Sequence, residues 1–134
     1  VHHQLPQASE ALNDFYDRYK DDSLTLNKWF MVQATIPLEE SVNVVKKLMT
    51  HPDFDIHNPN RVRALLGAFT SNTVAFNTKE GYNFISDQIL ALDKINPLLA
   101  SGLVQSFRSW KKMSPHLRAA AQKALNKLEK YYLS

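Results

Sequence analysis

Residues 58–69 have the sequence NPNRVRALLGAF, and its first two residues mark the start of a helix. An asparagine before the first turn accepts a hydrogen bond from an unpaired backbone N–H, and a proline at the first helical position loses no hydrogen bond there. The same pattern recurs at Asn96-Pro97 and at Ser114-Pro115. The three signatures predict helices over residues 59–71, 97–110 and 115–132.

Four further segments place apolar residues three and four positions apart, which is the spacing of a helix that faces a core. These segments are residues 5–19, 24–35, 38–50 and 79–95. Pro37 separates the second segment from the third, because the residue before a proline avoids the helical conformation. Thr78 is the expected cap of the last segment. No stretch alternates convincingly with a period of two residues, so no sheet is predicted.

Short links join the predicted helices, and short links make consecutive helices antiparallel neighbours. Such a series forms a compact bundle or a stack of hairpins, and units of roughly 40 residues favour the HEAT or armadillo kind of solenoid. We therefore predict an all-α fold of about seven helices, stacked as antiparallel hairpins in a HEAT/armadillo-like solenoid. It forms one domain over residues 1–134, with functional loops expected in the irregular stretches 51–57 and 72–77.

The composition restricts the class of protein. Hydrophobic residues make up 44% of the 134 residues, only three glycines are present, and there is no cysteine. A chain without cysteine has no disulfide framework and no thiolate metal site, and it fits the reducing cytoplasm, where we expect the protein. No apolar run approaches the ~18 residues that span a membrane, so no membrane partner is expected. Because the chain begins with Val1, we interpret it as a piece of a longer polypeptide.

Charge is distributed unevenly along the chain. Residues 1–56 contain five basic and nine acidic side chains, whereas residues 101–134 contain seven basic side chains and one acidic side chain. A basic segment of this kind can bind nucleic acid or a membrane surface. A solvated face, or a face that docks on an acidic neighbour, explains the same pattern and is the interpretation that we favour.

The sequence contains no recognised catalytic motif. The HExxH zinc motif, the G-x-S-x-G nucleophile motif, the phosphate loop and the dinucleotide-binding fingerprint are all missing. His51 and His57 share a loop with Asp53 and Asp55, but their spacing matches no known ligand pattern, and we interpret them as polar loop residues. We therefore predict no catalytic residue and no metal site in this chain.

Arg61 and Arg63 lie at the start of the predicted helix 59–71. Cations oppose the helix dipole at that end, which favours an anionic partner from outside the domain. The alternative is that both arginines pair with acidic side chains of the preceding helices, and the composition alone favours this alternative.

Gly67 and Gly102 fall inside predicted helices, where a glycine costs about 1 kcal/mol relative to alanine. Close packing of a neighbouring helix explains such a glycine, and so does a ligand or another domain that approaches the backbone. Of the two explanations, we favour packing.

Several motifs, in order along nearly the whole chain, resemble a known family. They are LNDFY at 12–16, DSL at 22–24, KWF at 28–30, HPDF at 51–54, NPNRVRAL at 58–65, GAF at 67–69 and NP at 96–97. The NPNRxR block followed by GAF is the most specific of them. On these residues the chain resembles the C-terminal domain of bacterial aminopeptidase N, in the gluzincin family of zinc aminopeptidases.

The resemblance implies a parent enzyme that removes N-terminal amino acids from peptides. In this family the zinc ligands, the general base and the glutamates that bind the substrate N-terminus lie in an upstream thermolysin-like domain. The helical C-terminal domain closes over that catalytic domain and helps form a chamber that admits peptides. We therefore expect zinc in the parent and no cofactor in this chain. The expected partners are the upstream catalytic domain and peptides, and this chain alone should be inactive.

Carried over position by position, the resemblance gives roles to six residues. Arg63 would face the chamber and contact the backbone or the carboxylate end of a bound peptide. Leu98 would border the pocket for the first side chain of the substrate and favour apolar side chains. Gly102 matches a chamber position where some relatives have an arginine, and a glycine cannot make that contact. The other three, which would fix their loop and its contact with the catalytic domain, are Asn58, Asn60 and Arg61.

The alternative to a peptidase domain is a free-standing helical-repeat module that binds protein or nucleic acid. A nucleic-acid interface would use the basic side chains of the last predicted helix, Arg118, Lys123, Lys127 and Lys130, and its affinity would fall steeply with salt. The peptidase resemblance argues against a nucleic-acid partner.

Overall fold

The computed structural model describes the backbone of residues 6–133 and the side chains of residues 10–129. Within these limits the chain is helical and contains no β-strand. The α-helices are α1 (Pro6–Tyr19), α2 (Ser23–Ala34), α3 (Ser41–Leu48), α4 (Pro59–Val62), α5 (Ala68–Ser71), α6 (Thr73–Phe76), α7 (Lys79–Asp93), α8 (Pro97–Val104) and α9 (Pro115–Leu133). A π-helical turn, Arg63–Gly67, joins α4 to α5, and two 3₁₀ turns, Gln105–Phe107 and Trp110–Lys112, follow α8.

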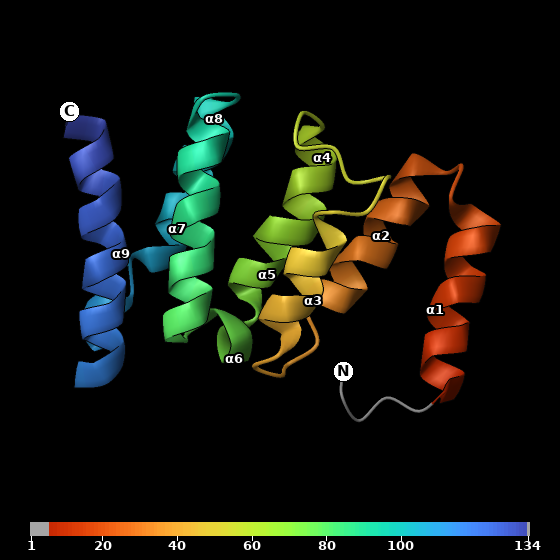
Figure 1. The fold of residues 1–134 in the computed structure, drawn as a ribbon, viewed down its shortest axis with the longest axis horizontal. Helices are drawn as coiled ribbons and strands as arrows, with labels where there is room; N and C mark the ends of the chain where they lie inside the picture. Colours follow the sequence, from red (N-terminus) through yellow and green to blue (C-terminus); the bar gives the residue numbers. More distant parts are fainter. Residues whose placement is uncertain (1–5, 134) are drawn as a thin grey trace.

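The helices lie side by side in one row, with α1 at one end and α9 at the other (Figure 1). The long helices alternate in direction along the row, so that α1 pairs with α2 and α7 pairs with α8, while α9 packs along α7. Helix α4, the π turn and α5 follow one another without a break and run in the same direction. Contacts of α2 with α3, and of α3 with α7, connect the two halves of the row. The predicted all-α stack of antiparallel hairpins is therefore confirmed.

The capping signatures work as the sequence predicts. The side-chain oxygen of Asn58 accepts a hydrogen bond from the backbone N–H of Arg61 at 3.1 Å, and α4 begins at the following proline. Asn96 caps α8 in the same way, through the N–H of Leu99 at 3.1 Å. The hydroxyl of Ser114 accepts from the N–H of Leu117 at 3.5 Å, a longer bond at the start of α9.

Two predicted helices are shorter in the structure than the sequence suggests. Residues 38–40 form turns rather than the first turn of α3, because the N–H of Ser41 bonds to the carbonyl of Leu38 at 3.0 Å, only three residues back. The predicted helix 97–110 ends at Val104 and continues in 3₁₀ turns. There the hydroxyl of Ser106 donates to the carbonyl of Leu103 at 2.5 Å, and side-chain bonds of this kind compete with the helical ladder.

The stretch 72–77 is not the irregular loop that the sequence predicts, because it contains α6. Asn72 caps this short helix through the N–H of Ala75 at 3.3 Å. Its amide nitrogen also donates to the carbonyls of Ala34, the last residue of α2, at 3.0 Å and Ile36 at 2.7 Å. Asn72 is only 5% exposed, so this polar side chain ties two distant parts of the chain together inside the protein.

The predicted helix 59–71 is present but is not regular. Between α4 and α5 the backbone widens into a π-helical turn, in which the N–H of Ala68 reaches the carbonyl of Arg63, five residues back. A π turn inserts one extra residue into a helix and is often found at functional sites. Here it begins at Arg63, the residue that the resemblance places in the substrate chamber.

One apolar core runs the length of the row. Phe30 of α2, Phe69 of α5 and Ile89 of α7 are completely buried. Full burial of a large apolar side chain stabilises the fold by about 1.5–3 kcal/mol. At the far end, α9 buries Ala121 and Leu128 against α7, and the exposed side chains in its described part are mostly polar.

The glycine that packing requires is Gly81, not Gly67 or Gly102. A Cβ added to Gly81 would lie 2.4 Å from the carbonyl oxygen of Phe76, which no real side chain tolerates. A Cβ on Gly67 would meet only the Cβ of Arg63 at 3.8 Å, and one on Gly102 would meet no described atom within 4 Å. The packing explanation for Gly67 and Gly102 is therefore wrong, because each has room for a side chain.

Candidate functional site

Arg61 is buried in the domain with only 6% of its surface exposed. Its guanidinium donates to the side-chain oxygens of Asn27, at 2.5 Å, and Ser23, at 3.3 Å, and to the backbone carbonyl of Asp53. It also lies over the ring of Phe30, 5.2 Å from the ring centre. This side chain joins the start of α4 to α2 and to the loop after α3.

The favoured sequence interpretation of Arg61 is therefore wrong in one respect. The three atoms that accept its hydrogen bonds are neutral, so none of them is the acidic side chain that the composition suggested. A buried cation needs such acceptors because its desolvation is otherwise costly. Asn27 could not be identified from the sequence as a partner of Arg61, since it lies 34 positions away.

Arg63 has the opposite environment, because its side chain is exposed. One guanidinium nitrogen, Nη1, donates to the side-chain oxygen of Asn60 at 3.3 Å. Among the ion pairs of the described side chains, none joins a carboxylate to Arg63. Most of its five N–H donors are therefore directed to solvent and available to an external carboxylate or carbonyl.

Leu98 and Gly102 lie four residues apart on α8, which places them on the same side of that helix. Leu98 is 82% exposed, more than any other large hydrophobic side chain among the described residues. Gly102 is also exposed, and open space lies where its side chain would be. This side of α8 therefore presents one exposed leucine and no bulky side chain at Gly102, one turn beyond it.

The structure brings these two regions to the same edge of the row. In Figure 1, α4 and α8 both begin at the upper edge and run downward. Arg63 follows the last residue of α4, and Leu98 is the second residue of α8. With a rise of about 1.5 Å per residue, both lie within the first two helical turns below that edge. The separate sequence motifs NPNRVR and NPLL thus both lie at this edge of the domain.

The loop 51–57, which contains His51 and His57, is held against the fold by contacts of His51. The ring nitrogen Nδ1 of His51 accepts a hydrogen bond from the backbone N–H of Asp53 at 3.0 Å. The ring packs against Tyr16, Trp29 and Phe30, with ring centres 5.1, 5.2 and 5.8 Å away. Within the described part of the chain, no three His, Cys, Asp or Glu side chains are grouped to hold a metal ion.

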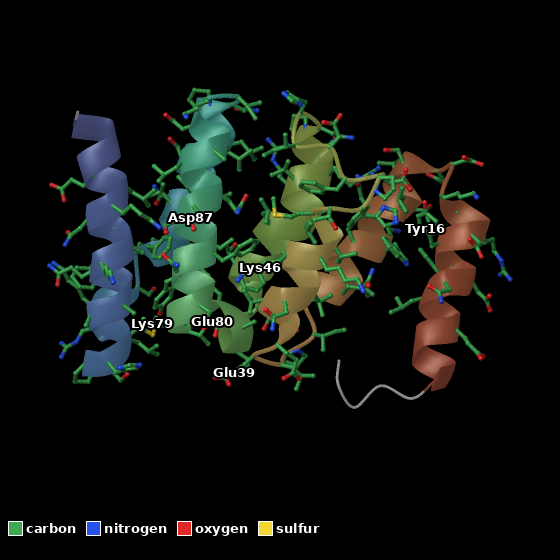
Figure 2. The ribbon with its side chains drawn as sticks, in the orientation of Figure 1. Tyr16, Glu39, Lys46, Lys79, Glu80 and Asp87 are labelled. Atoms are coloured by element: carbon green, nitrogen blue, oxygen red, sulfur yellow. The ribbon has the colours of Figure 1, made fainter. Side chains whose placement is uncertain are left out.

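Asp53 also accepts a hydrogen bond from the hydroxyl of Tyr16. This bond raises the pKa of Tyr16 above its usual value of 10.0, because ionisation of the phenol would place a second negative charge beside the carboxylate. Tyr16 lies on α1 where that helix faces α2 (Figure 2). The contact therefore holds the first helix to the loop that Arg61 also holds.

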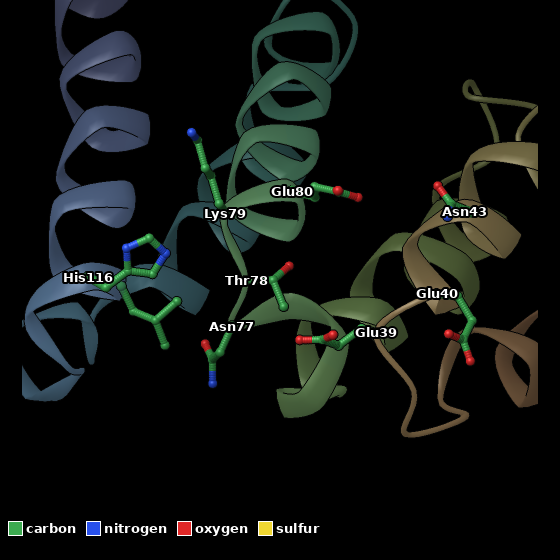
Figure 3. Close-up of a pocket in the computed structure, with 9 residues that line it drawn as sticks. Glu39, Glu40, Asn43, Asn77, Thr78, Lys79, Glu80 and His116 are labelled. Carbon is green, nitrogen blue, oxygen red and sulfur yellow. The ribbon is translucent and has the colours of Figure 1, made fainter.

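Two hollows in the described part of the chain do not include Arg63 or Leu98. One, of about 650 Å³, lies between α1, α2 and α3 and is lined by residues such as Leu12 and Trp29. The other, of about 550 Å³, lies where α3, α7 and α9 begin. Figure 3 shows the carboxylates of Glu39 and Glu80 toward its α3 side, with Lys79 and His116 toward α9. The hollow between α1, α2 and α3 is lined by residues of the LNDFY, KWF and HPDF motifs, although none of them was a predicted site residue.

The basic residues of α9 do not all remain free for a nucleic acid. Lys127 donates to a carboxylate oxygen of Asp87 at 2.6 Å and to the side-chain oxygen of Asn83 at 3.1 Å, which joins α9 to α7. Figure 2 shows Asp87 on the side of α7 that faces α9. Arg118 and Lys123 are exposed, and the side chain of Lys130 lies outside the described residues. The nucleic-acid interface stays an untested prediction.

Comparison with known proteins gives the same family over the whole chain. Residues 1–134 match the family described as "Domain of unknown function (DUF3458_C) ARM repeats". Aminopeptidase N of Caulobacter vibrioides is 38% identical over 111 residues, which are 81% of this chain and 13% of the relative. Aminopeptidase N of Escherichia coli is 33% identical over 129 residues, 94% of this chain and 15% of the relative.

A solved structure agrees with the fold. It is the crystal structure of Legionella pneumophila aminopeptidase A in complex with aspartic acid, which is 43% identical and superimposes with a TM-score of 0.84. The match covers 90% of this chain and 14% of that protein. No described helix is long and apolar enough to cross a membrane. The chain belongs to the DUF3458_C family of ARM-repeat domains and corresponds to the C-terminal domain of bacterial aminopeptidase N.

Proposed function

We propose that the chain is the non-catalytic domain of a zinc aminopeptidase, which closes over the upstream catalytic domain and forms one wall of the substrate chamber. The observation that carries this proposal is the difference between the share of this chain and the share of each relative that the match covers. The chain is matched over 81% to 94% of its length, yet it spans only 13% to 15% of the relatives. A piece of this size, matched to the C-terminal part of a peptidase, needs a partner that supplies the chemistry.

Zinc has no ligand set among the residues that the structure describes, since no three potential ligand side chains are grouped there. The side chains at the upper edge, Asn60, Arg63 and Leu98, are also unsuited to Zn²⁺, which prefers cysteine, histidine and carboxylate ligands. In the proposal, the metal and the groups that activate water therefore belong to the upstream domain. A cytoplasmic location, which the absence of cysteine favours, belongs to the same proposal.

The role proposed for Arg63 is to hold the part of the peptide that extends away from the reacting bond. Its guanidinium is exposed, and a planar guanidinium can bind a carboxylate or a backbone carbonyl with two parallel hydrogen bonds. Peptides offer these groups beyond their first residue, and single-residue chromogenic amides do not. Arg63 should therefore affect the binding of peptides more than the binding of such amides.

The role proposed for Leu98 is to form an apolar part of the chamber wall. An 82% exposed leucine in an isolated domain loses water-exposed apolar surface when another surface covers it. Gly102, one turn further along α8, leaves the wall without a cation at the position where some relatives have an arginine. Together the two residues would favour substrates with an apolar first side chain.

A second substrate preference has one observation in its favour. The structural relative with 43% identity is an aminopeptidase A that holds aspartic acid. If the parent enzyme shares that preference, it acts on acidic N-terminal residues rather than apolar ones. Initial rates of the parent enzyme on leucyl, alanyl, aspartyl and glutamyl chromogenic amides decide between the two preferences.

The purified chain itself tests the proposed function. We expect it to release no chromophore from alanyl or leucyl amides in the presence of zinc, whereas the full-length parent enzyme hydrolyses them under the same conditions. Hydrolysis by the chain alone, lost on addition of a chelator, would show that the catalytic site lies within these 134 residues and would overturn the proposal.

A further inference from the structure

We propose that Asn60 is a positioning residue for Arg63: its side-chain oxygen fixes the guanidinium in the orientation that binds peptide. The resemblance to the family instead implies that Asn60 fixes its loop and the contact of that loop with the catalytic domain. The inference rests on the proposed function, because it requires that Arg63 contacts substrate. It adds a residue whose contribution is to orient a neighbouring side chain and not to touch the peptide.

The first support is the contact itself. Nη1 of Arg63 donates to Oδ1 of Asn60 at 3.3 Å, and both side chains are exposed. The two residues are three positions apart on the same side of a helical turn, where side chains meet. No secondary structure depends on this hydrogen bond, so it serves the position of the arginine side chain.

The second support is the rigidity of the turn that carries Asn60. On one side, Pro59 occupies the first helical position with its backbone angle φ fixed, and Asn58 caps the turn. On the other side, the buried guanidinium of Arg61 is bound to Asn27 and Ser23 and covers the ring of Phe30. The backbone of Asn60 is therefore held from both sides, and a fixed backbone gives a defined position to its side-chain oxygen.

The third support is the chemistry of the amide. An asparagine oxygen accepts a hydrogen bond without neutralising the cation, whereas an aspartate at the same place would form an ion pair with Arg63. Four of the five N–H donors of the guanidinium stay available, enough for the two parallel hydrogen bonds that a carboxylate accepts. The arrangement orients the arginine and keeps its charge for a ligand.

Asn58 provides a matched control within the same motif. Its oxygen accepts from the backbone N–H of Arg61 and serves the start of α4, whereas the oxygen of Asn60 accepts from a side chain. Loss of Asn58 should lower the stability of the domain. Loss of Asn60 should leave stability unchanged and affect only the binding of peptides.

The test is a double-mutant cycle in the full-length parent enzyme, with a tetrapeptide and a single-residue chromogenic amide as substrates. The variants are Asn60→Ala, Arg63→Ala, the double variant, and the control Asn58→Ala. We expect Asn60→Ala to raise KM for the tetrapeptide about three- to tenfold, with kcat and the amide KM unchanged, because a mobile arginine must be ordered at each binding event. In the Arg63→Ala background the same substitution should change nothing.

Two conservative variants separate orientation from charge. Asn60→Gln keeps an amide oxygen and should restore part of the tetrapeptide KM. Asn60→Asp keeps an acceptor but neutralises the guanidinium, so its KM should be at least as high as that of Asn60→Ala. If Asn60→Asp instead lowers KM below the native value, neutral orientation is not what Asn60 supplies and the inference is overturned.

The outcomes of the cycle distinguish the inference from the proposed function. If Arg63→Ala raises the tetrapeptide KM but Asn60→Ala does not, the positioning role of Asn60 is wrong and the chamber role of Arg63 stands. The same conclusion follows if the effects of the two substitutions on KM are fully additive. If Arg63→Ala affects both substrates equally or neither, the chamber role itself fails. Melting temperatures of all variants show whether any effect comes from unfolding.

Discussion

Arg61 and Arg63 are two residues apart, yet the guanidinium of Arg61 is enclosed by α2 and the loop 51–57, while that of Arg63 lies in solvent. A helix turns by about 100° per residue, so residues two positions apart point in nearly opposite directions. The NPNRVR motif therefore contains one arginine that holds the domain together and one that faces outward. The two should respond very differently to the same substitution.

Arg61→Ala should destabilise the isolated domain by about 2–4 kcal/mol, because it leaves half-buried oxygen atoms without their donor and opens space beside Phe30. Arg63→Ala, the matched control, should change stability by no more than about 0.5 kcal/mol, since its side chain is exposed. Urea unfolding followed by circular dichroism measures both. Equal losses for the two variants would show that Arg63 also supports the fold.

Gly81→Ala should destabilise the domain by about 1–3 kcal/mol, because the new methyl group would collide with the carbonyl oxygen of Phe76, 2.4 Å from the ideal Cβ position. Gly102→Ala should instead stabilise it by about 0.5–1 kcal/mol, since alanine is the better helix former and no described atom lies within 4 Å. Thermal unfolding compares the two variants. A stabilising Gly81→Ala substitution would contradict the structure of the α6–α7 junction.

Tyr16 should make stability depend on pH in the alkaline range. Its pKa is raised in the folded state by the hydrogen bond to Asp53, so the neutral phenol is favoured by folding. The resulting stabilisation is present below the unfolded pKa of about 10 and is lost as pH rises through the higher folded pKa.

The Tyr16→Phe variant tests this pH dependence. Burial raises the pKa of Tyr82 in the same direction, so the variant should reduce the alkaline loss of stability without abolishing it. The free energy of unfolding, measured at several values between pH 8 and pH 11, provides the test. Identical slopes in the native chain and in Tyr16→Phe would show that the hydrogen bond to Asp53 does not affect the titration of Tyr16.

Leu98→Asp should leave the isolated domain as stable as before, to within about 0.5 kcal/mol, because the side chain is 82% exposed. In the full-length parent enzyme the same substitution should lower kcat/KM for leucyl amides relative to alanyl amides, since it would place a carboxylate in the wall of the proposed apolar pocket. The control is Leu24→Asp, which changes a 74% exposed leucine on α2. Equal effects of the two substitutions would remove Leu98 from the pocket.

The sequence predicted the parts of the fold that depend on local chemistry. An asparagine or serine before a proline starts a helix through contacts with its own first turn, and the three such signatures were followed by α4, α8 and α9. Apolar spacing within one segment identified α2 and α7 for the same reason. Because these features depend on residues close together in the chain, they can be predicted without knowing which helices pack against each other.

The features that the sequence did not reveal depend on residues far apart in the chain. Asn72 was expected in a loop, but its amide satisfies the carbonyls of Ala34 and Ile36, more than 35 residues away. The neutral partners of Arg61 come from α2 and from the loop after α3. Gly81 is required because the carbonyl oxygen of Phe76, in the preceding turn, lies where a side chain would be. The composition of the sequence does not distinguish this glycine from Gly67.

The candidate site, too, was only partly predictable from the sequence: its residues could be named, but their contacts could not. The resemblance pointed to Arg63, Leu98 and Gly102 from matching positions, and each is exposed in the structure. The contact between Asn60 and Arg63 required the side-chain geometry, because three-residue spacing alone permits many pairs. That Arg63 faces a chamber depends on a domain upstream of this chain, and only the full-length enzyme can test it.

The central claim is that Arg63 faces a chamber that small molecules enter and large ones do not. This chain has no cysteine, so Arg63→Cys and the control Glu129→Cys, on the exposed face of α9, introduce single thiols. In a full-length parent whose other cysteines are replaced, the thiol at position 63 should react with N-ethylmaleimide but not with a 5-kDa polyethylene-glycol maleimide (a probe chosen to be about a third of this domain's mass). Position 129 should react with both. Equal reaction of position 63 with the large reagent would contradict the claim.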